Sequence, residues 1–261
     1  MASVTDQRPV ARLAQPAPKT LRRDDWWVEP VITVVVLGAF IIYATWAALI
    51  NRNYYVRPYL SPFYSPCIAT NCVHSDVKIV GSWYTLSPAI LILPFPLAFR
   101  LTCYYYRKAY YRSFFWIPPA CAVRDVKPRY TGESRFPWLL QNAHRYFFYL
   151  AIPFPIILLW DGIRAFGFPG GIGMGLGTVV LLVNAVLLGA YTLSCHSCRH
   201  LCGGGVDVLS KAPVRQRLWT FVSRLNARHM QIAWISLVGV ALTDLYVRLV
   251  ATGTIHDPRF F

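Results

Sequence analysis

Long apolar runs separated by polar, basic segments are the dominant pattern of this chain. The run Val31–Ile50 has twenty residues without a charge, about the length that crosses the ~30 Å hydrocarbon core of a membrane as a helix. Further runs predict spans at about Tyr84–Leu101, Tyr146–Phe168, Thr178–Leu193 and Met230–Val250. The pattern therefore predicts an all-α integral membrane protein, a bundle of five transmembrane helices.

Prolines and charged residues within these runs modify the prediction. The second run contains Pro88, Pro94 and Pro96, so we expect a kinked or partly broken helix there. Asp244 and Arg248 are four residues apart in the last run, a spacing that lets them pair on one helical face.

The first 29 residues differ in composition from the rest. They are polar, charged and proline-containing, and no cleavable signal peptide is visible in them. We expect a cytoplasmic N-terminal tail over residues 1–29 and one five-helix transmembrane anchor domain over residues 30–261.

Composition and charge agree with a membrane protein. The chain has 261 residues, of which 56% are hydrophobic and 14% charged, with a net charge of +15. The basic residues lie between the apolar runs, which argues against a nucleic-acid partner. With a cytoplasmic N-terminus, the inner segments hold 20 Lys and Arg and the outer segments 6. The positive-inside rule therefore favours this orientation in a multi-pass plasma-membrane protein, in contact with membrane lipids.

A dense group of cysteines and histidines follows the fourth run. The stretch Cys195–Cys202 contains three of the seven cysteines and two of the six histidines, and thiolates and imidazoles are ligands for zinc, copper and iron–sulfur clusters. If the fourth helix continues through Cys202, its cysteines form one stripe and its histidines a neighbouring stripe. Four ligands from one helix would be strained, so we expect other segments to contribute. The candidate metal ligands are Cys121, His144, Cys195, His196, Cys198, His200 and Cys202.

The orientation sorts the cysteines into two groups. Cys103 and the ligand candidates fall on the cytoplasmic side, as does His229. Cys67 and Cys72 fall together on the opposite, oxidising side, and we expect them to form a disulfide.

Three sequence features carry a family resemblance. They are the Tyr- and Arg-rich segment leading to Pro118-Pro119-Ala120-Cys121, the segment Asn142-Ala143-His144-Arg145-Tyr146, and the segment Ser194-Cys195-His196-Ser197-Cys198-Arg199-His200. Together with the five spans, they resemble the membrane-anchor subunit (cytochrome b-like, C-type) of an actinobacterial, mycobacterial-type succinate dehydrogenase.

The resemblance implies a subunit that docks a flavoprotein and an iron–sulfur subunit on its cytoplasmic face, with a further small membrane subunit as another partner. Electrons from succinate would pass to menaquinone, and succinate oxidation itself would reside in the partners. The resemblance also implies a Rieske-type [2Fe–2S] cluster held by two Cys and two His in place of haem b. Aromatic, cationic and imidazole side chains at the helix ends are candidates to bound the quinone headgroup: Tyr104, Arg107, Trp138, Arg145, Tyr146 and His229.

The sequence departs from the soluble Rieske motif, which is Cys-x-His followed by Cys-x-x-His. Here the order is Cys195-His196 and Cys198-Arg199-His200, so ligands cannot be assigned from that motif. A haem b between two histidines, such as His144 with His196 or His229, remains an alternative. A transporter and a zinc-stapled membrane scaffold are alternatives from other classes.

Overall fold

The structure is a computed structural model that describes residues 24–67, 78–80, 84–118, 134–136 and 138–261. Its α-helices are α1 (Val28–Leu49), α2 (Pro88–Ile92), α3 (Pro94–Thr102), α4 (Tyr104–Phe114), α5 (His144–Ala151), α6 (Pro153–Arg164), α7 (Leu176–Leu193), α8 (His196–Gly203), α9 (Pro213–Asn226) and α10 (His229–Ala251). Three 3-10 helices are η1 (Pro62–Tyr64), η2 (Trp138–Ala143) and η3 (Leu209–Lys211). Six short strands pair into three antiparallel hairpins: β1 (Tyr55–Val56) with β2 (Tyr59–Leu60), β3 (Lys78–Val80) with β4 (Tyr84–Thr85), and β5 (Gly167–Phe168) with β6 (Gly171–Ile172).

Four helical stretches of the described chain are long and apolar enough to cross a membrane: Val28–Leu49, Trp138–Arg164, Leu176–Leu193 and His229–Ala251. They confirm four of the five predicted runs. Their outward faces are apolar, with Val35 63% and Ile42 74% exposed. Exposed apolar area of this kind on a helical bundle is suited to contact with lipid.

The second predicted run forms two helices rather than one. α2 begins at Pro88 and α3 at Pro94, with Leu93 between them. Proline lacks a backbone N–H and clashes with the preceding turn, which explains the predicted break. Neither short helix is among the four long stretches.

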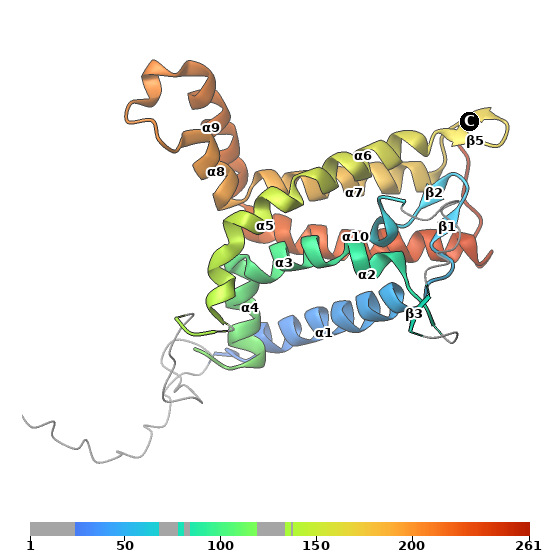
Figure 1. Cartoon of the computed structure of the whole chain (residues 1–261), viewed down its shortest axis with the longest axis horizontal. Coiled ribbons are helices and arrows are strands. Elements are labelled where there is room, and N and C mark those ends of the chain that lie inside the picture. Colours follow the sequence, from blue (N-terminus) through green and yellow to red (C-terminus); the bar gives the residue numbers. More distant parts are fainter. Residues whose placement is uncertain (1–23, 68–77, 81–83, 119–133, 137) are drawn as a thin grey trace, which may run out of the picture.

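The helices α1, α3, α6, α7 and α10 run side by side along the long axis of the molecule (Figure 1). α7 packs against α6 and α10, α1 packs against α4 and α10, and α3 packs against α5. The β-hairpins and the C-terminus lie at one end of the bundle, here called the hairpin end. The helices α4, α8 and α9 lie at the opposite end, here called the α4 end.

A buried ion pair fastens α10 at the hairpin end. Arg248 Nε donates to Asp244 Oδ2 over 2.8 Å, which confirms the pairing predicted from their spacing. Tyr43 of α1 and Ser61 before η1 also donate to the Asp244 carboxylate. Arg248 Nη2 donates to the carbonyl oxygen of Ala47 over 2.9 Å. This network ties three separate segments of the chain together.

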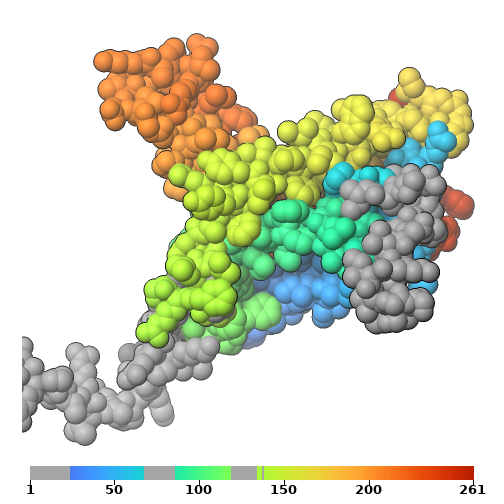
Figure 2. Space-filling model, viewed as in Figure 1, coloured from blue at the N-terminus to red at the C-terminus, as the bar shows by residue number. Residues whose placement is uncertain are grey.

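The α8–α9 segment projects away from the body of the bundle (Figure 2). Arg199 of α8 lies 5.0 Å from the ring centroid of Trp219 in α9 and donates to Ser223 over 3.0 Å. Arg215 donates to the carbonyl oxygens of Cys202 and Gly204 at the end of α8. The two short helices therefore hold each other in place beyond the end of α7.

Candidate functional site

Two cysteines and two histidines meet at the α4 end, and each lies at a helix boundary. Cys103 separates α3 from α4, His144 begins α5, Cys195 precedes α8, and His229 begins α10. His144 Nε2 lies 3.2 Å from Cys195 Sγ, and Cys103 Sγ lies 3.5 Å from His229 Nε2. The two pairs belong to one buried cluster, in which the stacked rings of Phe99 and Tyr191 link the two imidazoles. We call these four residues the Cys/His set.

Hydroxyl groups fix the orientation of both imidazoles. Thr102 Oγ1 lies 2.8 Å from His144 Nδ1 and donates its own proton to the carbonyl oxygen of Ala98. Ser194 Oγ lies 2.7 Å from His229 Nδ1 and donates to the carbonyl oxygen of Tyr191. Because each hydroxyl proton is used by a carbonyl, each Nδ1–H is the donor to its hydroxyl oxygen. Both Nε2 atoms then carry a lone pair directed at a thiol, as metal-ligating histidines do.

Aromatic rings stack on the same imidazoles. The rings of Phe99 and His144 have centroids 5.0 Å apart and planes 7° apart. Those of Tyr191 and His229 are 5.2 Å apart with planes 5° apart. Packing and hydrogen bonding together hold the four donor atoms in place, as a preorganised ligand site requires.

Burial changes the acidity of two thiols in this region, Cys195 and Cys198. Cys103 is 2% exposed and Cys195 1%. Burial raises the pKa of Cys195 to about 11. Burial, and then the neighbouring Cys202, raises the pKa of Cys198 to about 12. A bound cation would lower these pKa values and favour the thiolate form of the cysteines.

The remaining predicted metal ligands of the described residues lie on α8. Cys198 lies beside Cys202 and shares a buried cluster with Cys103 and Cys195, while His196 and His200 are exposed. Cys121 lies outside the described residues. No three His, Cys, Asp or Glu side chains of the described residues come together around a single metal position.

One geometric expectation is wrong. The fourth helix does not continue through Cys202, because α7 ends at Leu193 and α8 begins at His196. Cys195 has an extended backbone between the two helices and accepts a hydrogen bond from the backbone N–H of Ser197. The break removes Cys195 from the stripe formed with Cys198 and Cys202 and turns it toward His144.

The residues predicted to bind quinone are dispersed. Tyr104 and Tyr146 are exposed, at 62% and 71%. Trp138 packs on the rings of Tyr111 and Phe115. Arg145 Nη2 lies 2.6 Å from His200 Nδ1, and Arg107 interacts electrostatically with His144.

The predicted disulfide falls only partly on the described chain. Cys67 is disulfide-bonded. Cys72, its predicted partner, lies outside the described residues. The pairing of these two cysteines therefore stays a prediction.

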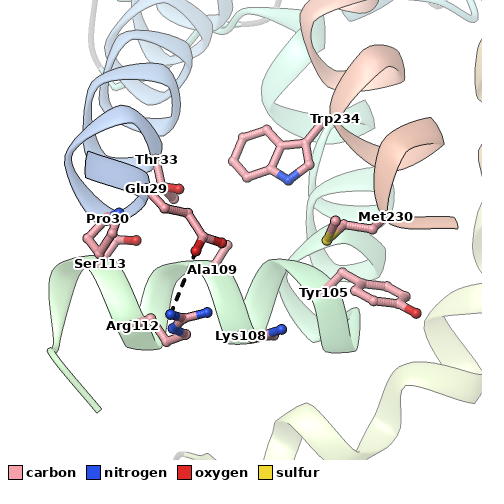
Figure 3. Close-up of a pocket in the computed structure, with 10 residues that line it drawn as sticks. All are labelled: Glu29, Pro30, Thr33, Tyr105, Lys108, Ala109, Arg112, Ser113, Met230 and Trp234. Atoms are coloured by element: carbon pink, nitrogen blue, oxygen red, sulfur yellow. Dashed lines mark ion pairs between the residues drawn. The ribbon is translucent and has the colours of Figure 1, made fainter. Parts of the chain in front are cut away.

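A partly open pocket lies between α1, α4 and α10 (Figure 3). Side chains of α4 and α10 and the start of α1 line it: Glu29, Pro30, Thr33, Tyr105, Lys108, Ala109, Arg112, Ser113, Met230 and Trp234. Glu29 and Arg112 form an ion pair of 3.7 Å across it. The ring centroid of Tyr105 lies 5.5 Å from that of His229, so one aromatic ring separates the pocket from the set.

Sequence reasoning missed Cys103 as a possible ligand and considered His229 for quinone or haem only. The only sequence signal for Cys103 was its place on the side of the other cytoplasmic thiols. No spacing links it to His229, because 126 positions separate the two residues.

Comparison with known proteins identifies relatives of the chain. The family model described as "Actinobacterial succinate dehydrogenase subunit SdhC" matches residues 28–253. Among solved structures, the chain is similar to one in the Mycobacterium smegmatis Sdh1 complex in the apo form, with 50% sequence identity and a TM-score of 0.86. That alignment covers 97% of this chain and 98% of the other. A comparison with curated proteins gives no match.

Proposed function

Since the chain belongs to the family of actinobacterial succinate dehydrogenase subunit SdhC, and so is a multi-pass membrane subunit of that enzyme, we propose that it carries electrons from its partners to menaquinone. The partners are a flavoprotein and an iron–sulfur subunit, docked on the cytoplasmic face. The single observation that carries the proposal is the Cys/His set, which collects four metal-ligand side chains at the basic end of the bundle.

A cytoplasmic N-terminus and five membrane crossings fit this role. α1 begins at the α4 end and α10 finishes at the hairpin end (Figure 1), so the described chain crosses the bundle an odd number of times. The broken pair α2–α3 supplies the fifth crossing, beside the four long stretches. The excess of Lys and Arg in the segments of the α4 end supports a cytoplasmic position for that end and offers a surface for acidic partners.

The donor atoms of the Cys/His set suit a Rieske-type [2Fe–2S] cluster. Two thiols and two imidazoles are the Rieske ligands, with both cysteines at one iron and both histidines at the other. Here each histidine contacts a cysteine, and no three of these side chains surround one metal position among the described residues. The donor types, rather than the way they pair, support the assignment. When bound, such a cluster would accept and release one electron at a time.

An orphaned hydroxyl supports the same assignment. Tyr191 is 0% exposed, its hydroxyl has no well-formed hydrogen bond among the described residues, and Cys103 is the sulfur beside it. A buried donor with a weak acceptor is costly. A thiolate at Cys103, as in a bound cluster, would accept this proton more strongly than the thiol does.

Haem b is the alternative cofactor, with His144 and His229 as axial ligands. The two Nε2 atoms each face a thiol over 3.5 Å or less. A haem between them would have to displace both sulfur atoms. The observed contacts therefore favour the cluster.

The pocket between α1, α4 and α10 is the proposed headgroup site for menaquinone. Trp234 offers an aromatic ring, while Thr33, Ser113 and Lys108 offer hydrogen-bond donors to quinone oxygens (Figure 3). Of the residues predicted for quinone, His229 contacts the lining residue Tyr105. Contact through one aromatic ring gives electrons a short path from the Cys/His set to the quinone.

Iron and sulfide analysis of the purified complex tests the proposal. We expect the visible spectrum to lack a haem Soret band and the iron and acid-labile sulfide to exceed the content of the iron–sulfur subunit by two atoms each. Cys195→Ser should remove that excess without loss of the assembled complex. An unchanged excess in this variant, or a Soret band in the wild type, would contradict the cluster assignment.

A further inference from the structure

The positively charged side chain of Arg100 lies close to the Cys/His set. The guanidinium carbon of Arg100, in α3, lies 4.6 Å from the ring centroid of Tyr191. Its Nη1 donates to the Tyr106 hydroxyl over 2.5 Å, and its Nη2 donates to Ser236 Oγ over 3.1 Å. Tyr106 in turn donates to the carbonyl oxygen of Ala233 over 2.6 Å. Arg100 is thus held rigidly by α4, α7 and α10.

The charge of Arg100 has no acidic counterpart in the described part of the chain. Its contacts are with two tyrosines, a serine and a backbone carbonyl, all of them neutral. Arginine stays protonated in proteins. An uncompensated cation within a membrane protein is costly and marks a functional position by default. Negative charge that develops nearby would offset this cost.

The Cys/His set is a place close to Arg100 where such charge can develop. The Tyr191 ring contacts the guanidinium of Arg100 and stacks on the imidazole of His229 at 5.2 Å. The guanidinium therefore lies no more than about 10 Å from the ring centre of His229. One electron added to a centre held by these ligands adds one negative charge, while the charge of Arg100 stays constant.

We infer that Arg100 tunes the redox centre. Its fixed positive charge, next to Tyr191, stabilises the reduced state of the centre and raises its midpoint potential. The inference rests on the proposed function, because it requires a redox centre at the Cys/His set. The electron comes from the iron–sulfur subunit and leaves to the quinone. No proton or further reactant is needed at Arg100.

The magnitude follows from Coulomb's law. A unit charge about 10 Å away, at an effective dielectric constant of about 20, changes the equilibrium constant for reduction on the order of tenfold. For a one-electron couple, tenfold corresponds to about 59 mV.

The test is a redox titration of the assembled complex, with the reduced centre followed by EPR. Arg100→Gln should lower the midpoint potential by the equivalent of about tenfold. Arg100→Lys is the matched control, because it keeps the charge and should stay close to the wild-type potential. A purely structural role would make both variants alike. Equal potentials for wild type and Arg100→Gln would overturn the inference.

A second pair of variants covers the case in which Arg100→Gln does not assemble. Ser236→Asp would place a carboxylate beside Arg100 Nη2 and cancel its charge, whereas Ser236→Asn adds similar bulk without charge. The Asp variant should have the lower potential of the two, and equal potentials would overturn the inference. A wild-type complex with no redox signal from this subunit would refute the proposed function, and the inference with it. Absence of the signal is distinct from a signal whose midpoint potential does not change when the charge at position 100 is removed.

Discussion

Each member of the Cys/His set is fixed by its own local neighbours. The hydroxyls of Thr102 and Ser194 receive Nδ1–H from the two histidines. The opposite nitrogen of each ring faces a thiol. The chemistry of the site therefore depends on individual side chains rather than on a contiguous motif.

Serine substitutions separate the ligand set found in the structure from the set predicted by sequence. Cys103→Ser and Cys195→Ser should each abolish the redox centre, because oxygen is a poor replacement for a thiolate ligand to iron. Cys198→Ser and Cys202→Ser should retain it, since these thiols lie beside each other on α8 and neither forms a hydrogen bond with His144 or His229, which contact Cys195 and Cys103 instead. EPR and iron content of the four purified complexes check this. Loss of the centre in Cys198→Ser with retention in Cys103→Ser would instead support the sequence-based ligands.

Residue types alone could predict half of the Cys/His set. His144 and Cys195 were identifiable because they begin or follow an apolar run at the basic side of the membrane. Cys103 was not, because a lone cysteine has no spacing signal and is more often a small buried hydrophobe. Only the packing of α3 and α4 against α10 brings Cys103 to His229.

At the scale of elements, hydrophobic length was the most informative signal. Apolar runs long enough to cross a membrane are visible in any sequence, and four of the five predicted here correspond to long helical stretches. The break after Leu193 was invisible to the same reasoning. The two residues after Leu193 are Ser194 and Cys195, neither of which is a helix breaker such as proline or glycine. The sequence therefore did not mark the end of α7.

The ion pair of α10 should contribute strongly to stability. Asp244→Ala would leave Arg248 buried without its partner, at a cost of about 3–5 kcal/mol in the free energy of unfolding. The double variant Asp244→Leu with Arg248→Met removes both charges and should recover part of that loss. Thermal unfolding of the purified complexes measures both. A double variant less stable than Asp244→Ala would contradict this explanation of the network.

The start of α7 depends on a glycine. A Cβ added at Gly177 would lie 2.6 Å from ring carbons of Tyr59, closer than carbon atoms approach. Gly177→Ala should therefore lower stability by about 1–3 kcal/mol, the usual cost of overpacking. Gly38→Ala is the matched control, since nothing lies within 4 Å of its added Cβ and alanine favours helix. Equal unfolding temperatures for the two variants would show that Tyr59 moves aside freely.

At the scale of the whole molecule, charge and topology agree. The basic helices α4, α8 and α9 lie at the α4 end with the helix boundaries that carry the Cys/His set, while the C-terminus lies at the hairpin end (Figure 1). Positive charge at one end both orients the protein in the membrane and favours docking of acidic partners there. The Cys/His set consequently lies at the end where the proposal places the docked partners.

Orientation can be measured directly with an affinity tag at each terminus. In inverted membrane vesicles, which expose the cytoplasmic face, protease should remove the N-terminal tag and spare the C-terminal one. Right-side-out vesicles should give the reverse result, because five crossings place the termini on opposite sides. Removal of both tags from the same kind of vesicle would require an even number of crossings.

The most direct test of a histidine-ligated cluster in this subunit is the EPR spectrum of the succinate-reduced complex, compared between wild type and His229→Ala. We expect a [2Fe–2S] signal with nitrogen couplings from histidine ligands, present in the wild type and lost or altered in the variant. The assignment of a histidine-ligated cluster to this subunit would be contradicted by a wild-type complex that shows haem bands in its optical spectrum and whose EPR signals carry no histidine nitrogen coupling.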